Sequence, residues 1–219
     1  MEQRKARMKD FLAESLVVLM QEKPFEKITI KQICDRTGVI RATFYNHFED
    51  KYAALDYVCG MMLCEKRQAL IAAGEMESYI RSLCIEIYDH AGFFRKAFQV
   101  QGQNDFDTMF LTHAGRGIRA ILDQEGRWEG AYDSEELSLY YANAFMYLCK
   151  EWLRRGCVMS AQEFCGYSLG LLMNGLKAVS YTHLPRKAHL HVMTTRSFTP
   201  CAAGARSYGG AGSRWRSCS

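Results

Sequence analysis

Proline is scarce in this chain, and the patterns typical of several protein classes are missing. Only 3 of the 219 residues are proline, and alternating β-branched stretches are few, which argues against a β-sandwich or barrel. No apolar run reaches the roughly 18 residues that a membrane-spanning helix needs, and no signal peptide opens the chain. Leu, Ala, Met, Glu, Lys and Arg dominate instead. We therefore expect an all-α, cytoplasmic protein with no membrane association.

Signatures of a cofactor, a metal site or an enzyme are also missing. The 9 cysteines form no CxxC pair and have no histidine partners at ligand spacing, so we expect reduced cytosolic thiols and no metal. A redox-sensing cysteine is the alternative to plain buried thiols. Gly115-Arg116-Gly117 is too short for a phosphate-binding loop, and no nucleophile, base and orienting group converge. We expect no enzyme and no cofactor.

The formal charge of +4 is unevenly distributed. Beyond Leu184 the chain has no acid, and its six bases are Arg186, Lys187, Arg196, Arg206, Arg214 and Arg216. Without these six, 22 basic residues face 24 acidic ones (28 − 6 against 24), so the overall charge is no evidence for DNA binding. The relevant charge is local to the N-terminal region, where an ordinary solvated helix face is the alternative to a phosphate-binding one.

Residues 28–55 have the pattern of a helix-turn-helix followed by a further helix. Thr29 and Gln32 have the spacing of a capping box, and apolar residues recur at helical spacing up to Cys34. Gly38 can take the positive φ that a tight turn between helices needs. Two short helices joined by a glycine turn are typical of DNA-binding proteins.

The second short helix is expected at residues 41–47, with Phe44 and Phe48 pointing inward and the small Ala42 allowing a close helix crossing. Its outward side chains are hydrogen-bond donors that can meet phosphates or base edges. They are Arg41, Thr43, Tyr45, Asn46 and His47.

The run TGVIRATFYNHFEDKYAAL resembles the signature of the TetR family of one-component transcriptional regulators, with a match over about residues 7–63. The positions that carry the resemblance are Phe44, Tyr45, His47, Phe48 and Lys51. One departure concerns Ile40, because the family usually has a small capping residue such as Ser there. The second helix should then lack its side-chain cap, at a cost of about 1 kcal/mol.

The predicted DNA-binding residues are Thr29, Arg41, Ala42, Thr43, Tyr45, Asn46, His47 and Lys51. Arg41 is the first choice for a base contact, and Thr43 is the second, through its methyl group to thymine. Tyr45, His47 and Lys51 should hold phosphates, and Thr29 can add a phosphate contact. Lys51 stands at the start of a helix that Asp50 can cap, and a helix N-terminus favours phosphate. The resemblance places this helix N-terminus on the DNA backbone.

We divide the chain into a DNA-binding domain at residues 1–50, a helical effector-binding and dimerisation domain at 51–178, and a disordered or non-native tail at 179–219. Further helices are expected at 51–74, 79–90, 93–98, 105–125, 133–156 and 160–175, with a loop at 126–130. The resemblance implies a three-helix head followed by a ligand-binding, dimeric helical domain.

Aromatic and Met residues of the middle helices give a plausible effector pocket, although such residues at helical spacing are more often plain core. They are Phe94, Phe98, Phe106, Met109, Phe110, Tyr141 and Phe145. The last two helices should pair with those of a second copy, or else pack in a monomeric core. The candidate interface residues are Leu148, Trp152, Phe164, Tyr167 and Leu171.

Together these features predict a ligand-responsive transcriptional regulator, most simply a repressor that binds an inverted-repeat operator in double-stranded DNA as a homodimer. A small-molecule effector would release it. The alternative is a partner-binding adaptor that keeps the fold without reading an operator, and Ile40 is its only support in the sequence.

Overall fold

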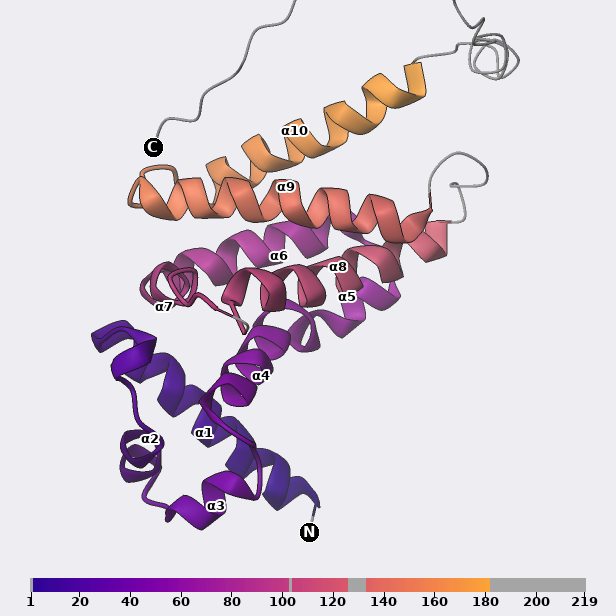
Figure 1. Ribbon diagram of the computed structural model, residues 1–219. Helices are drawn as coiled ribbons and strands as arrows, with labels where there is room; N and C mark the ends of the chain where they lie inside the picture. Colours follow the sequence, from indigo (N-terminus) through magenta and orange to yellow (C-terminus); the bar gives the residue numbers. More distant parts are fainter. Residues whose placement is uncertain (1, 103, 126–132, 182–219) are drawn as a thin grey trace, which may run out of the picture. The chain divides into compact units, whose positions relative to one another are not determined.

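The computed structural model describes residues 2–102, 104–125 and 133–181, and all regular structure in these ranges is helical (Figure 1). The all-α class is thereby confirmed. The predicted loop at 126–130 and residues 182–219 of the predicted tail lie outside the described residues, whereas residues 179–181, which we expected to begin the tail, continue the last helix. None of the described helices combines the length and the hydropathy of a membrane span.

Three α-helices and one 3-10 turn form the N-terminal head, and their cores come from apolar residues at helical spacing. They are α1 (Glu2–Glu22), η1 (Phe25–Lys27), α2 (Ile30–Thr37) and α3 (Arg41–Tyr45). Leu12 and Leu16 of α1 are fully buried, as are Ile33 of α2 and Phe44 of α3. The head therefore has a hydrophobic core that fixes α2 and α3 against α1.

Helix α4 (Lys51–Leu63) joins this head to the remaining helices, because it packs against both α1 and α8. The helix expected to run from Lys51 to about residue 74 is interrupted at Cys64, whose φ of −121° and ψ of −56° leave the helical region. The short elements η2 (Glu65–Arg67) and α5 (Gln68–Ala72) follow. The buried Arg67 side chain accounts for this break, since its guanidinium donates to the carbonyls of Met62 and Ser82.

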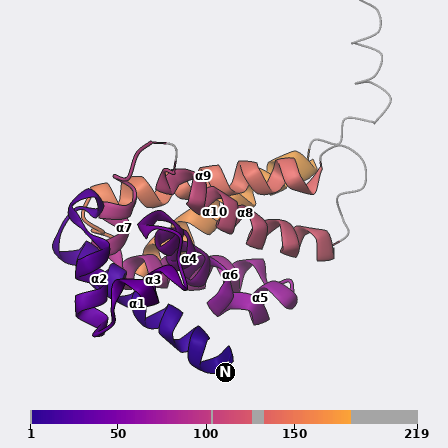
Figure 2. The ribbon, with the colours of Figure 1, turned by 60° about the horizontal axis from the view of Figure 1, so that its bottom comes forward.

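The remaining helices form a second group. It comprises α6 (Met76–Asp89), α7 (Ala91–Ala97), α8 (Phe106–Glu125), α9 (Ser134–Arg154) and α10 (Ala161–Tyr181). Helix α8 lies between α4 and α9, and α7 contacts both α9 and α1 (Figures 1 and 2). Side chains cap the starts of both last helices: Asp133 accepts the N–H of Glu135 (3.1 Å), and Ser160 accepts that of Glu163 (3.3 Å).

Candidate nucleic-acid interface

Helix α2 begins and ends at residues that fix it by local hydrogen bonds. Thr29 Oγ1 accepts the N–H of Gln32 (3.3 Å), and Gln32 Oε1 accepts the N–H of Thr29 (3.1 Å). At the other end Gly38 has a φ of 68°, and the N–H of Val39 reaches back to the carbonyl of Cys34 (3.0 Å). The predicted capping box and glycine turn are both confirmed, so the chain leaves α2 at a fixed residue.

Helix α3 is packed on one side and open on the other. The fully buried Phe44 lies with its ring centroid 5.6 Å from that of Phe48, which lies equally close to Tyr57 of α4. On the open side the exposed residues are Arg41, Ala42, Tyr45 and Asn46, whereas Thr43 and His47 are half-buried. The structure therefore brings these six predicted DNA-binding residues together on one short helix and its C-terminal flank.

Two exposed side chains at this helix have no structural use that the fold reveals. Arg41 makes no hydrogen bond or ion pair with any residue in the described ranges. Ile40 is the N-cap of α3, is 72 % exposed and makes no side-chain cap hydrogen bond, as its departure from the family pattern predicts. Both residues stand at the end of α3 that a recognition helix presents to base edges.

Lys51 points inward rather than outward. Its ammonium group donates to the carbonyls of Phe25 (3.0 Å), Glu26 (3.3 Å) and Ile28 (3.1 Å), and it lies 4.5 Å from the centroid of the Phe25 ring. Burial lowers the pKa of Lys51 below the usual lysine value. All three donors of the ammonium are thus used within the head, so the geometry favours an internal role for Lys51 over the predicted phosphate contact.

Two joints hold α4 in place, and sequence reasoning missed both. Tyr57 Oη donates to Asp10 of α1 (2.7 Å), and Lys9 lies 4.0 Å above the Tyr57 ring. One residue earlier, Asp56 Oδ1 lies 2.9 Å from Nε2 of the buried His113 on α8. No signal in the sequence could have paired Asp56 with His113, because 57 positions separate them.

The His113 ring fits against α4 because residue 60 is glycine. A Cβ atom at Gly60 would lie 2.8 Å from Cε1 of His113, closer than real contacts allow. An Arg116 nitrogen also lies 3.3 Å from Nδ1 of the ring. Helices α4 and α8 are therefore joined by a close approach as well as by a polar contact.

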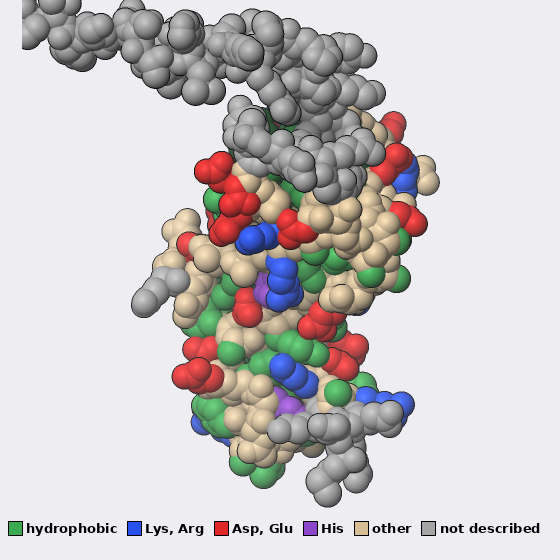
Figure 3. All heavy atoms as spheres, turned by 90° about the vertical axis from the view of Figure 1, so that its right-hand side faces the viewer, with side chains coloured by type: hydrophobic (Ala, Val, Ile, Leu, Met, Phe, Trp, Pro, Cys, Tyr) green, Lys and Arg blue, Asp and Glu red, His purple; other side chains and the backbone are tan. Residues whose placement is uncertain are grey.

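Charge near the head is mixed in sign. Figure 3 shows acidic and basic side chains interspersed on the face that it draws. Arg36 is held loosely by Glu22 (3.7 Å), Lys9 covers an aromatic ring, and Lys51 is internal, which leaves Arg41 as an unpaired cation on α3. Lys31 of α2 is also exposed and has no hydrogen-bond or ion-pair partner among the described residues, so the head keeps more than one cation that can attract phosphate regardless of sequence.

Five of the seven predicted effector-pocket residues lie together, but their rings pack against one another. Ring centroids 5.1–6.5 Å apart connect Phe94, Phe98, Phe106, Phe110 and Phe145 in one aromatic cluster from α7 to α9. Met109 and Tyr141 are also buried.

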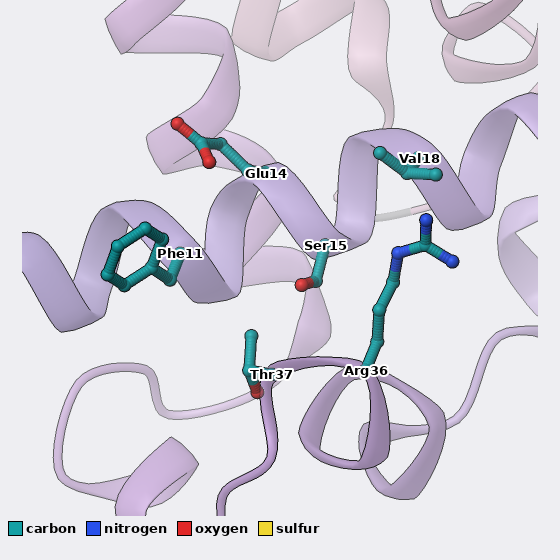
Figure 4. A pocket seen from close by; sticks show the side chains of 6 residues that line it. All are labelled: Phe11, Glu14, Ser15, Val18, Arg36 and Thr37. Atoms are coloured by element: carbon teal, nitrogen blue, oxygen red, sulfur yellow. The ribbon is translucent and has the colours of Figure 1, made fainter.

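A cavity of about 410 Å³ lies elsewhere, between α1 and the end of α2. Figure 4 shows its lining, formed by Phe11, Glu14, Ser15, Val18, Arg36 and Thr37.

The predicted interface residues divide into two groups. The rings of Trp152 and Phe164 stack at 3.9 Å inside the protomer, and both residues are buried. Tyr167 and Leu171 of α10 are each half exposed, and Leu148 is half-buried. Sequence reasoning missed the most exposed apolar residues of α9, which are Leu139, Tyr140 and Tyr147.

The described thiols are mostly enclosed. Of the seven described cysteines, only Cys157 is not buried. Burial raises the pKa of Cys84 to about 12 and that of Cys149 well above its ordinary value. Such thiols stay protonated and behave as small apolar groups. No group of three or more His, Cys, Asp or Glu residues within the described ranges could hold a metal ion.

Two family models match the chain. Residues 14–58 match the model described as bacterial regulatory proteins of the tetR family, and residues 74–172 match a transcriptional regulator C-terminal region. The first match contains the whole of α2, the turn and α3, and the second contains α6 to α9. No curated protein sequence matches the chain.

Solved structures with the same fold share little sequence with this chain. The dihydroxyacetone kinase operon activator DhaS is 19 % identical with a TM-score of 0.57, covering 78 % of this chain and 97 % of its own. FadR of Bacillus halodurans, a fatty acid degradation regulator, is 13 % identical (TM-score 0.58), covering 76 % and 98 %. The repressor FadR of Thermus thermophilus, in complex with lauroyl-CoA, is 19 % identical (TM-score 0.58), covering 76 % and 94 %.

Proposed function

Because the chain belongs to the TetR family of bacterial transcriptional regulators, we propose that it is a ligand-responsive repressor which binds an inverted-repeat operator as a homodimer. The main observation that supports this proposal is the exposed side of α3. Arg41 and Asn46 are exposed there on a helix whose opposite side is buried through Phe44. A helix held in this way can enter the major groove without unfolding any packed residue.

Within the groove, Arg41 is proposed to read a base edge, since a guanidinium can bond guanine O6 and N7 together. Tyr45 and His47, one turn further along, are proposed to contact phosphates, and Thr29 joins them from the start of α2. Two such heads would occupy successive major grooves about 34–36 Å apart. Lys51 would support this surface from behind, through the carbonyls before Thr29.

The homodimer is proposed to form through α9 and α10. Tyr140 and Tyr147 are 66 % and 69 % exposed, and seven residues separate them, so they lie on one face of α9. Tyr167 and Leu171 give α10 a similar exposed pair four residues apart. Large aromatic residues exposed in a row favour a partner surface over solvent. Trp152 and Phe164, by contrast, would support this interface from inside the protomer.

The effector is proposed to bind at the aromatic cluster of α7, α8 and α9. Since its rings are in contact, a ligand would have to separate them, and an apolar or aromatic molecule could replace the lost contacts. Phe106 and Phe110 lie on the same helix as His113, which contacts α4. A ligand that prefers a shifted α8 would therefore weaken operator binding by its differential affinity for the two arrangements.

Selection of binding sites from a random duplex library, with the full chain, tests the DNA-binding proposal. We expect enrichment of an inverted repeat bound by two protomers, with affinity measured by fluorescence anisotropy at two salt concentrations. A folded protein that enriches no sequence would contradict operator reading and favour the partner-binding adaptor. A reporter gene behind the selected operator gives the sign of regulation, which the fold leaves open because its relatives include an activator and a repressor.

The interface is tested by introducing charge on the exposed face of α9. Tyr147→Glu should shift the chain from dimer to monomer in analytical ultracentrifugation, because a carboxylate would be buried without a partner. Phe11→Glu, which places the same charge on an exposed apolar position of α1, serves as the matched control. Equal sedimentation of Tyr147→Glu and the unaltered dimer would reject this interface.

A further inference from the structure

Ile40 occupies a position at which its side chain contributes nothing to the fold. As N-cap of α3 it makes no side-chain cap hydrogen bond, and β-branched apolar residues are among the least favourable at that position. Nor does it gain by burial, because 72 % of its surface is exposed. Stability therefore does not explain an isoleucine at residue 40.

The backbone around Ile40 is nevertheless fixed. Its carbonyl accepts the N–H of Thr43 (2.9 Å), which closes the first turn of α3. The preceding Val39 packs against the core and bonds Cys34 through its N–H. The aliphatic side chain is thus held at a defined place beside the unpaired Arg41, at the leading end of the proposed recognition helix.

We propose that Ile40 is a specificity-determining residue that contacts the C5-methyl group of a thymine in each operator half-site. This inference rests on the proposed function and adds the chemistry of one base that the operator must contain. Thymine alone presents a methyl group in the major groove, and an aliphatic side chain recognises it by apolar contact rather than by a hydrogen bond. Consecutive Cα atoms are about 3.8 Å apart, and base pairs rise by about 3.4 Å. The thymine therefore lies within about two base pairs of the base that Arg41 reads.

The test replaces each thymine of the selected operator, one at a time, with deoxyuridine. This change removes the methyl group and keeps the hydrogen-bonding edge and the pairing. The full chain should bind about 4-fold more weakly when one particular thymine of a half-site is replaced, the factor expected for losing one buried methyl group. Other thymines should tolerate the replacement, apart from any that meets the Thr43 methyl.

Two variants assign the effect to residue 40. Ile40→Ser should bind the thymine operator more weakly and lose the response to deoxyuridine at that thymine, yet melt at a higher temperature, because Ser supplies the missing cap. Ile40→Val keeps two methyl groups and should keep the response. A fall in affinity together with a rise in melting temperature separates base reading from a merely structural role.

The outcomes distinguish this inference from the function on which it rests. Recovery of no operator would overturn the proposed function and this inference with it. An operator whose thymines all tolerate deoxyuridine would overturn the inference alone, as would an Ile40→Ser variant that responds to deoxyuridine like the unaltered chain.

Discussion

Replacing Lys51 with Met removes an ammonium group and keeps most of the aliphatic side chain. Three hydrogen bonds disappear, and two of the acceptor carbonyls, those of Phe25 and Ile28, are part-buried. The carbonyl of Glu26 is exposed and can bond water instead. With roughly 1.5–3 kcal/mol for each charge-assisted bond to a buried acceptor and partial compensation by water, we expect the free energy of unfolding to fall by about 2–4 kcal/mol.

Urea denaturation followed by circular dichroism measures this loss. With an m-value of about 2 kcal/mol/M, the midpoint should fall by about 1–2 M. Lys31→Met is the matched control, because Lys31 is exposed on α2 and has no hydrogen-bond partner among the described residues. Its midpoint should change little, as surface substitutions usually alter stability by less than about 0.5 kcal/mol.

DNA binding provides the decisive comparison. If Lys51 holds no phosphate, the dependence of log Kd on log salt should be the same for Lys51→Met as for the unaltered chain, measured where both are folded. Loss of one phosphate contact would make the slope shallower by about 0.9 per protomer. An unchanged urea midpoint together with a shallower slope would refute the internal role and restore the phosphate contact that the sequence predicts.

Three further substitutions test other parts of the structure. Arg41→Ala should cost about 1–3 kcal/mol of binding at one operator position, and uniform loss across a panel of operator variants would make Arg41 a phosphate contact instead. Gly60→Ala should push His113 from its place and lower the melting temperature by an amount equivalent to about 1–3 kcal/mol. Gly115→Ala is the control and should be neutral or stabilising, because the nearest atom to its new Cβ lies 3.9 Å away. Equal effects of the two substitutions would contradict the close approach of His113 to Gly60. Thr29→Ala should cost about 1 kcal/mol of stability in urea denaturation, and a loss below 0.3 kcal/mol would show that the capping box contributes little.

Features decided within one helical turn could be predicted from the sequence. The capping box at Thr29, the turn at Gly38, the cap at Asp50 and the missing cap at Ile40 each depend on residues at most five positions apart. Their geometry follows from local backbone hydrogen bonds. The short helix that begins at Arg41 and its open side could therefore be predicted from the sequence.

Features that depend on packing between distant segments could not be predicted from the sequence. Lys51 donates to carbonyls 23–26 positions earlier in the chain. The sequence pattern does not distinguish this internal contact from a contact of the ammonium group with a phosphate. Trp152 and Phe164 have the helical spacing of an interface, yet they stack on each other within the protomer. The sequence pattern identifies which residues are apolar, but it does not say whether the opposing surface belongs to the same chain.

Asp56 and Tyr57 give helix α4 two neighbouring anchors that face different helices. One bond of 2.9 Å runs to α8 and one of 2.7 Å runs to α1, from side chains about 100° apart around the helix axis. Turning α4 about its own axis would move both side chains away from their partners' present positions, so the two bonds resist twisting of α4. A displacement that preserves both bonds must carry α1, α4 and α8 together. A displacement of α8 is then passed on to α1 through α4, because α4 cannot rotate freely between its two neighbours.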